Sequence, residues 1–151
     1  MEFDANDVYV GTDNGLYRAA RADPTEWLRV NDLVGGPMHA LLVTADRIYA
    51  GSDNFPSPRG LWILDLDGAD LYGLLLDGTG VIRFAVDPVN SAHVLVGTRI
   101  GEIYATTNSG SELTLVRTSL TGAHVAAILF DDSSDQVILG TGSLGMYVES
   151  I

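Results

Sequence analysis

The stretch Val8–Thr12 (VYVGT) decides the fold, because the same pattern occurs four times along the chain. It returns as IYAGS at 48–52, VLVGT at 94–98 and VILGT at 137–141, and the copies begin 40, 46 and 43 residues apart. Each copy has a β-branched residue, two apolar residues, a glycine and a hydroxyl residue. A pattern kept at a nearly fixed period indicates a repeat architecture.

A second pattern follows each copy at a similar period. It is a glycine with an aromatic residue close behind, in the segments Gly15–Tyr17, Gly60–Trp62, Gly101–Tyr104 and Gly145–Tyr147. The aromatic residues are 45, 42 and 43 residues apart, and the third copy has one extra residue after its glycine. Two independent strings that keep the same period predict a repeated structural unit.

Further short β-type runs complete each unit. Met38–Val43, Val81–Val86 and Val125–Phe130 precede the glycine strand, and Trp27–Val30, Leu71–Leu76 and Leu113–Arg117 follow the aromatic strand. Each unit is therefore predicted to hold four strands, A to D, joined by turns rich in Gly, Asp, Asn, Ser and Pro. Apolar residues are nowhere spaced as in a helix over three turns, so we expect essentially no helix.

Four antiparallel strands in every 40 to 45 residues are typical of one blade of a β-propeller. The expected fold is an all-β propeller of about four blades, with the first and last incomplete. We place its repeat units at about 1–37, 38–80, 81–123 and 124–151 of a single domain. One blade cannot bury both of its faces, so the core is expected between stacked blades. The glycine that ends each B strand is expected to mark a bulge or a close approach by the next segment.

The turns between strands C and D resemble the BNR, or Asp-box, family of propellers, which includes sialidases, sortilin-type receptors and photosystem assembly factors. The family pattern is an aromatic residue followed by Ser-x-Asp-x-Gly-x-Thr-Trp. The third unit keeps a worn version of it, in Tyr104, Thr106, Asn108, Gly110 and Leu113. The second unit keeps Trp62, Asp67-Gly68 and Leu71, and the first keeps Tyr17 and Trp27. The resemblance implies the fold and a structural role for this turn, and no particular activity.

The charge of the chain is strongly negative. The chain has 20 acidic residues, 15 of them Asp, and only eight basic residues, all of them Arg, which gives a net charge of −12. Nucleic acid is therefore not expected as a partner, because phosphate contacts need clustered basic residues. Asp is a favoured turn residue, and an acidic surface is also an adaptation to high salt, so a halophilic source is one of two interpretations. No apolar run is long enough for a membrane span and no secretory signal is visible, so we expect a cytoplasmic protein without a membrane partner.

The incomplete terminal units predict self-assembly. Unpaired strand edges are normally paired or covered, so we expect a homo-oligomer, most simply a dimer that closes one ring of eight blades. A four-bladed ring built from one chain, or a piece of a larger propeller with no function of its own, are the alternatives.

One insertion marks a candidate binding surface. The loop between strands B and C is longest in the second unit, at Asp53–Arg59, and two prolines stiffen it, so Phe55 and Arg59 are candidate contacts for a ligand or partner. His39, Arg83 and His124 stand at the starts of A strands, which line the channel of a propeller, and are expected at the same end. A decorated surface turn and plain channel lining are the structural alternatives.

No set of residues suited to catalysis can be assembled from the sequence. The scattered Arg and the five Glu residues do not match a sialidase site, and the two channel histidines have no matched carboxylate for a metal. Asp65–Asp70 resembles the start of a calcium loop but lacks its later ligands, so we interpret it as a turn. The leading hypothesis is a non-catalytic binding or assembly propeller that presents loops to a protein or small ligand, without a cofactor. The alternative is a carbohydrate-binding or glycosidase-like propeller.

Overall fold

The computed structural model describes residues 1–151 except 54–59, 70, 118–121, 132–135 and 151. Within these residues the chain forms fifteen strands in four antiparallel sheets, and no helix. This arrangement confirms the predicted all-β propeller blades. The first blade comprises β1 (Glu2–Phe3), β2 (Asp7–Thr12), β3 (Gly15–Ala20) and β4 (Leu28–Arg29). The second comprises β5 (Met38–Val43), β6 (Arg47–Ser52), β7 (Gly60–Asp65) and β8 (Leu71–Leu75).

The third and fourth blades repeat this pattern up to the last strand. The third comprises β9 (Val81–Asp87), β10 (Asn90–Thr98), β11 (Ile103–Thr106) and β12 (Thr114–Arg117). The fourth comprises β13 (Val125–Asp131), β14 (Gln136–Thr141) and β15 (Met146–Ser150). In every sheet the strands are hydrogen-bonded in chain order, so a described strand D is present in three blades and the fourth sheet ends at β15.

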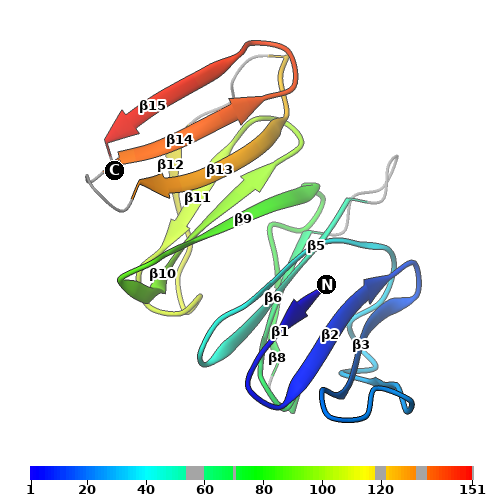
Figure 1. Ribbon diagram of the computed structural model, residues 1–151. Helices are drawn as coiled ribbons and strands as arrows, with labels where there is room; N and C mark the ends of the chain where they lie inside the picture. The colour runs from blue at the N-terminus through cyan, green and yellow to red at the C-terminus, as the bar shows by residue number, and fades with distance from the viewer. Residues whose placement is uncertain (54–59, 70, 118–121, 132–135, 151) are drawn as a thin grey trace.

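The blades stack side by side in an arc. The inner strands contact one another in the order β1, β5, β9, β13. Figure 1 shows the first blade, which holds the N-terminus, and the fourth blade, which ends near the C-terminus, at opposite ends of this arc. The first and fourth blades therefore each have one face that no described blade covers.

The core lies between the blades. One cluster joins the first and second blades around Tyr9 and Trp62, a second joins the second and third around Tyr49 and Val96, and a third joins the third and fourth around Leu95 and Leu139. In the second and third blades, the B strand alternates its side chains between the preceding and the following blade, because successive residues of a strand point to opposite faces. This explains why the B strands have nearly continuous apolar sequences.

The glycine that ends each B strand permits close packing between blades. A Cβ atom on Gly51 would lie 2.7 Å from the Val81 Cγ1 atom, and one on Gly97 would lie 2.7 Å from the Val125 Cγ1 atom. Both valines begin the inner strand of the following blade. The second of the two expected roles, close approach by the next segment, is therefore confirmed at these positions.

The hydroxyl residue after that glycine closes the turn to strand C. The Thr12 hydroxyl donates to the Gly15 carbonyl at 2.9 Å and accepts from the Asn14 backbone N–H at 3.1 Å. Thr98 and Thr141 make the corresponding pairs of hydrogen bonds in the third and fourth blades. The repeated Gly-Thr pair thus combines blade packing with a turn that satisfies its own backbone.

The turn between strands C and D of the third blade is also closed by its own side chains. The Thr106 hydroxyl donates to Asn108 Oδ1 and accepts from the Gly110 N–H, both at 2.9 Å. Gly110 has a φ of 85°, and a Cβ there would lie 2.5 Å from the Ile63 Cδ1 atom of the second blade. The turn therefore packs against the preceding blade, as a structural element does.

Candidate functional site

The open face of the fourth blade is apolar and exposed. We define it as Leu129, Ile138, Met146 and Val148, which lie on one side of β13, β14 and β15. Leu129 is opposite Ile138, and Ile138 is opposite Val148, so these three form a row across the sheet. The exposed fractions are 59% for Leu129, 70% for Met146 and 54% for Val148. A cluster of exposed apolar side chains on one sheet face is typical of an interaction surface.

The same register positions are buried in the other blades. Met146 is opposite Gly140, and the residues opposite the corresponding glycines are Leu16, Leu61 and Ile103. Those three side chains are 0%, 0% and 3% exposed, because each faces the next blade. The open face of the fourth blade therefore has the composition of an interface between blades.

The open face of the first blade is its counterpart. We define it as Val10, Tyr17 and Trp27, which with Thr12 line a shallow apolar hollow of about 340 Å³. Val10 is opposite Tyr17, as Ala50 is opposite Trp62 in the second blade. Ala50 and Trp62 are buried against the first blade, whereas Trp27 is 43% exposed.

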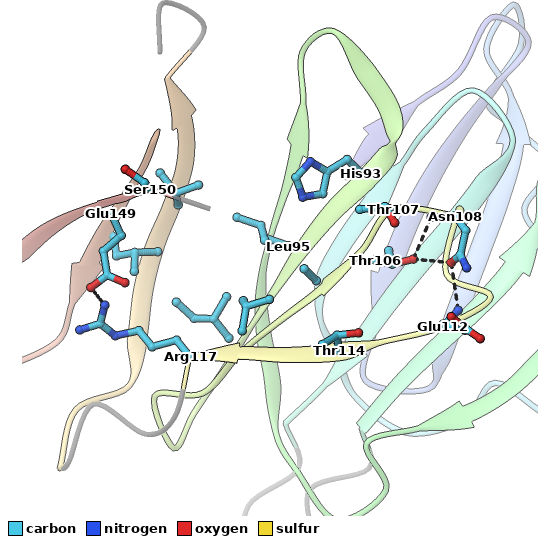
Figure 2. Close-up of a pocket in the computed structure, with 15 residues that line it drawn as sticks. His93, Leu95, Thr106, Thr107, Asn108, Glu112, Thr114, Arg117, Glu149 and Ser150 are labelled. Atoms are coloured by element: carbon cyan, nitrogen blue, oxygen red, sulfur yellow. Dashed lines mark hydrogen bonds and ion pairs between the residues drawn. The ribbon is translucent and has the colours of Figure 1, made fainter. Parts of the chain in front are cut away.

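A larger cavity lies between the third and fourth blades. This outer groove, of about 490 Å³, runs between β12 and β15. Its apolar walls come from both blades and consist of Leu95, Ile103, Ala105, Val137 and Leu139. Figure 2 shows Leu95 near the middle of the opening, with strands of the third blade on one side and of the fourth on the other.

Polar side chains surround the outer groove. Arg117 of β12 forms an ion pair with Glu149 of β15, and its guanidinium lies 5.3 Å from the centre of the Tyr147 ring. Glu112 and Asn108 stand on the third-blade side, where the Glu112 N–H donates to Asn108 Oδ1 at 3.0 Å. The ion pair joins the two blades at one end of the groove and leaves the rest of its opening accessible (Figure 2).

His93 lies at the other end of the groove. Its ring packs edge-on against Phe130 at 5.0 Å between centroids, and its Nδ1 atom is 3.4 Å from Asp87 Oδ2. The Val89 backbone N–H, followed by the His93 side chain, holds the pKa of Asp87 below its usual value. These contacts fix the His93 ring in place as part of the wall.

The predicted channel residues occupy the starts of the inner strands. His39 is exposed near the beginning of β5, and His124 is exposed directly before β13. Arg83 of β9 donates from Nε to the Ala126 carbonyl of the fourth blade and from Nη1 to the Ile82 carbonyl, both at 2.6 Å. Its guanidinium thus links two blades. Phe55 and Arg59, the other two predicted contacts, lie outside the described residues.

An ion pair between a buried carboxylate and a half-exposed arginine, next to the inserted loop, was not predicted from the sequence. The Asp53 carboxylate is 2% exposed and accepts hydrogen bonds from Nε and Nη2 of Arg99. Asp53 follows the B strand of the second blade and Arg99 follows that of the third. Removing Arg99 would leave the buried Asp53 carboxylate without its counter-charge, so this pair holds the residues that follow the two B strands against each other.

Within the described residues, neither a cluster of metal-ligating side chains nor a membrane-spanning helix is found. No group of three His, Cys, Asp or Glu side chains in the described ranges is placed to hold a metal ion. In the same ranges, no helix is long and apolar enough to cross a membrane.

Sequence reasoning missed both the outer groove and the Asp53–Arg99 pair. The local repeat pattern carries no signal for either feature, because each depends on how neighbouring blades meet.

Comparisons with known proteins support the fold. No family model matches the sequence, and no curated protein does. Among solved structures, the computationally designed protein Ika4 is 18% identical with a TM-score of 0.74, over 99% of this chain and 88% of that one. An ancestral GH74 enzyme, AFV00434, is 23% identical with a TM-score of 0.78, over 97% of this chain and 21% of that one.

The C-terminal WD40 domain of Sif2 is another such structure, 12% identical with a TM-score of 0.72, over 99% of this chain. The chain spans 44% of the length of that structure. At these identities the likeness concerns the path of the backbone alone. Taken with the four antiparallel sheets, it establishes that the chain folds as stacked β-propeller blades.

Proposed function

We propose that the chain is a non-catalytic assembly scaffold, which pairs head to tail with a second copy to complete a propeller ring. The observation that carries this proposal is the open face of the fourth blade, where Met146 is 70% exposed although Ile103, at the same register position, is 3% exposed. The open face of the first blade is the surface that the repeat pattern would place against it.

The proposed pairing extends the interface already present between blades. Trp62 of the second blade packs against the first, and Tyr17 holds the same register position on the open face of the first blade. Two chains related by a twofold axis would cover both open faces at two equal junctions, which is a closed assembly. The product would have eight blades, within the usual range for propellers.

Burial of the apolar open faces is the main favourable energy for such a pairing. Full burial of a Val, Leu or Met side chain contributes about 1.5–3 kcal/mol. Leu129, Met146 and Val148 are each more than half exposed, and the two junctions double their contribution. This gain has to exceed the cost of association and the repulsion between two chains that each carry a net charge of −12.

Sedimentation equilibrium at micromolar concentration tests the pairing. The wild-type chain should sediment with twice its mass of 16.1 kDa. Replacing Met146 and Val148 by Asp should give monomers that keep the β-sheet circular dichroism spectrum. Val89→Asp is the matched control, since Val89 is 89% exposed in a turn of the third blade, and it should remain paired. A wild-type chain that stays monomeric in high salt would disprove the proposal.

The loop face is the proposed place for a further ligand or partner. Phe55 and Arg59 of the inserted loop, with His39 and His124, remain the predicted contacts, whereas the link from Arg83 to Ala126 favours a structural role for that side chain. Double substitution of Phe55 and Arg59 by Ala should leave the fold intact and weaken binding by more than about 1 kcal/mol. A partner bound at the opposite end of the blades would exclude this placement.

Kinship with the Asp-box propellers is proposed on the geometry of one turn. The Thr106 hydroxyl takes the place of the family's Ser, and the Asn108 side chain that of its Asp, in a closed hydrogen-bonded turn. Restoring the family residues with Thr106→Ser and Asn108→Asp should therefore preserve the melting temperature. A clear loss of stability would argue that this turn is unrelated.

A further inference from the structure

A further cavity, which we call the turn cavity, lies among the A–B turns of the first three blades and has a volume of about 660 Å³. Its walls come from residues 3–6 of the first blade, 43–45 and Leu66 of the second, and 86–89 and Ser91 of the third. Figure 1 shows these three turns along the same edge of the arc. Each of the three blades has four strands, so the cavity is a feature of complete blades.

Two carboxylates line the turn cavity from blades on either side of the second. Asp4 belongs to the first blade and Asp87 to the third, and the inner strands of the three blades contact one another in chain order. The Val89 N–H is the main cause that holds the pKa of Asp87 below its usual value. Burial tends to raise the pKa of Asp4, but hydrogen bonds lower it overall. Both side chains are therefore ionised at neutral pH.

Each carboxylate keeps room for a further hydrogen-bond donor. Asp4 accepts three hydrogen bonds from its own blade, and Asp87 accepts the Val89 N–H at 2.9 Å and lies 3.4 Å from the His93 Nδ1 atom. An ionised carboxylate has about four acceptor positions. Neither His93 nor Tyr9, the two side chains that hold these carboxylates, lines the cavity. Among the described lining residues there is no Arg, Lys or His, so both charges face the cavity without a basic side chain in its wall.

The second blade places apolar side chains between the two carboxylates. Val43 and Leu66 line the cavity there, beside Phe3 of the first blade and Val89 of the third. Phe3 is 53% exposed and Val89 is 89% exposed, so part of this apolar surface is left uncovered by the described residues. The Phe3 ring already attracts one cation on its outer side of the site, since the Arg21 guanidinium, which is not a lining residue, lies 5.5 Å from the ring centre.

This arrangement of charge, apolar surface and charge selects the class of ligand. An anion would be repelled by both carboxylates, and no group of three ligating side chains among the described residues is placed to hold a metal ion. We propose that the turn cavity binds an aliphatic diammonium ion, that is, a diamine or polyamine, with one ammonium group at Asp4, the other at Asp87 and the methylene chain across the second blade. The cavity is within the usual size range of small-ligand sites, and the net charge of −12 attracts a dication.

The turn cavity is independent of the two surfaces proposed above. It lies at the end of the blades opposite the loop face and takes a small cation, whereas the loops were proposed for a separate ligand or partner. It also contains no residue of the open faces. The chain with Met146→Asp and Val148→Asp, and the chain with Phe55→Ala and Arg59→Ala, should therefore bind diamines as the wild type does, whatever happens to pairing or to binding at the loops.

Isothermal titration calorimetry with linear diamines of increasing chain length is the test. At an ionic strength of about 0.15 M, which screens diffuse attraction to the surface, one diamine should bind per chain and one chain length should bind best. The best diamine should bind at least tenfold more tightly than the monoamine of the same chain length, because the monoamine reaches only one carboxylate. No saturable binding, or affinity that depends on ligand charge but not on chain length, would overturn the proposal.

Three variants at exposed turn positions locate the bound diamine without touching the core. Ala45→Lys places an ammonium group in the cavity between the two carboxylates and should weaken binding at least tenfold. Ala45→Glu adds a side chain of similar size and opposite charge, and should bind at least as tightly as the wild type. Ser143→Lys adds the same positive charge at the B–C turn of the fourth blade and should not change the affinity. If Ala45→Lys and Ser143→Lys weaken binding equally, the diamine is held by the overall charge and the turn cavity is not its site.

Discussion

Met146 in β15 holds the register position that Ile103 holds in β11, yet the two side chains are 70% and 3% exposed. The cause is the neighbouring blade, because Ile103 faces the fourth blade and Met146 faces the side where no described blade stands. The proposed pairing rests on this exposed side chain, which holds a position that is buried between blades elsewhere in the chain. The packing between neighbouring blades and the charge repulsion between two chains can each be tested.

The pairing should strengthen with salt. Each chain carries a net charge of −12, so two chains repel one another, and raising the ionic strength shortens the range of that repulsion. Apolar burial between the open faces is not weakened by salt. Sedimentation at increasing sodium chloride should therefore show a falling dissociation constant. A dissociation constant that rises with salt would indicate an interface held by opposite charges instead.

Glycine at the end of a B strand should be required only where another blade follows. Gly97→Ala would place a Cβ atom 2.7 Å from the Val125 Cγ1 atom, so the free energy of unfolding should fall by about 1–3 kcal/mol. At Gly140 the nearest atom, the Ala127 Cβ, would be 3.3 Å away, and Gly140→Ala should change stability by less than about 1 kcal/mol. Urea unfolding of the two variants, each combined with Met146→Asp and Val148→Asp so that the chain stays unpaired and no blade follows the fourth, gives the comparison. Equal losses would mean that the interface between blades does not select glycine.

Tyr9 and Tyr49 hold the same register position, but removing the hydroxyl should lower the folding stability only at Tyr9. The Tyr9 hydroxyl donates to Asp4 Oδ2 at 2.8 Å and lies 3.2 Å from the Leu66 carbonyl, so Tyr9→Phe should cost about 1–2 kcal/mol. The buried Tyr49 hydroxyl has no hydrogen-bond partner among the described residues, and burial raises its pKa. Tyr49→Phe should therefore be neutral or raise stability by up to about 2 kcal/mol. Thermal melting distinguishes the two outcomes, and a large loss at Tyr49 would reveal an unseen partner.

The strands could be predicted from the sequence because each blade repeats the same local pattern. The predicted inner strand at Met38–Val43 is β5, and the predicted B strand at Ile48–Gly51 lies within β6. The exposed open faces and the outer groove depend instead on which neighbour is missing. Leu95 and Tyr49 have the same pattern in the sequence, yet Tyr49 is covered by the third blade's strand D turn and Leu95 borders a cavity. Such differences between repeats that share one pattern arise from their position in the stack, which a local pattern does not contain.

The first blade should be stabilised by Asp4 above acidic pH. Burial tends to raise the pKa of Asp4, but hydrogen bonds from the Asp7 N–H, the Tyr9 hydroxyl and the Asn6 N–H lower it overall below 3.8. Well above pH 3.8 the carboxylate is ionised in both the folded and the unfolded chain, so its full contribution is present. As the pH falls further the unfolded chain takes up the proton first, and the contribution is lost as the pH falls through the folded pKa.

Asp4→Asn should therefore destabilise the chain most at neutral pH, and its difference from the wild type should shrink as the pH is lowered from about 5 to about 2. Urea unfolding across this range measures the difference. Asp13→Asn, at an exposed turn position in the same blade, is the control for removing one negative charge. A difference for Asp4→Asn that is constant with pH, or one that Asp13→Asn reproduces, would show that the hydrogen bonds to the carboxylate do not favour its ionised form. The same experiment on Tyr9→Phe should show a smaller pH dependence than the wild type, since that variant removes one of the three donors.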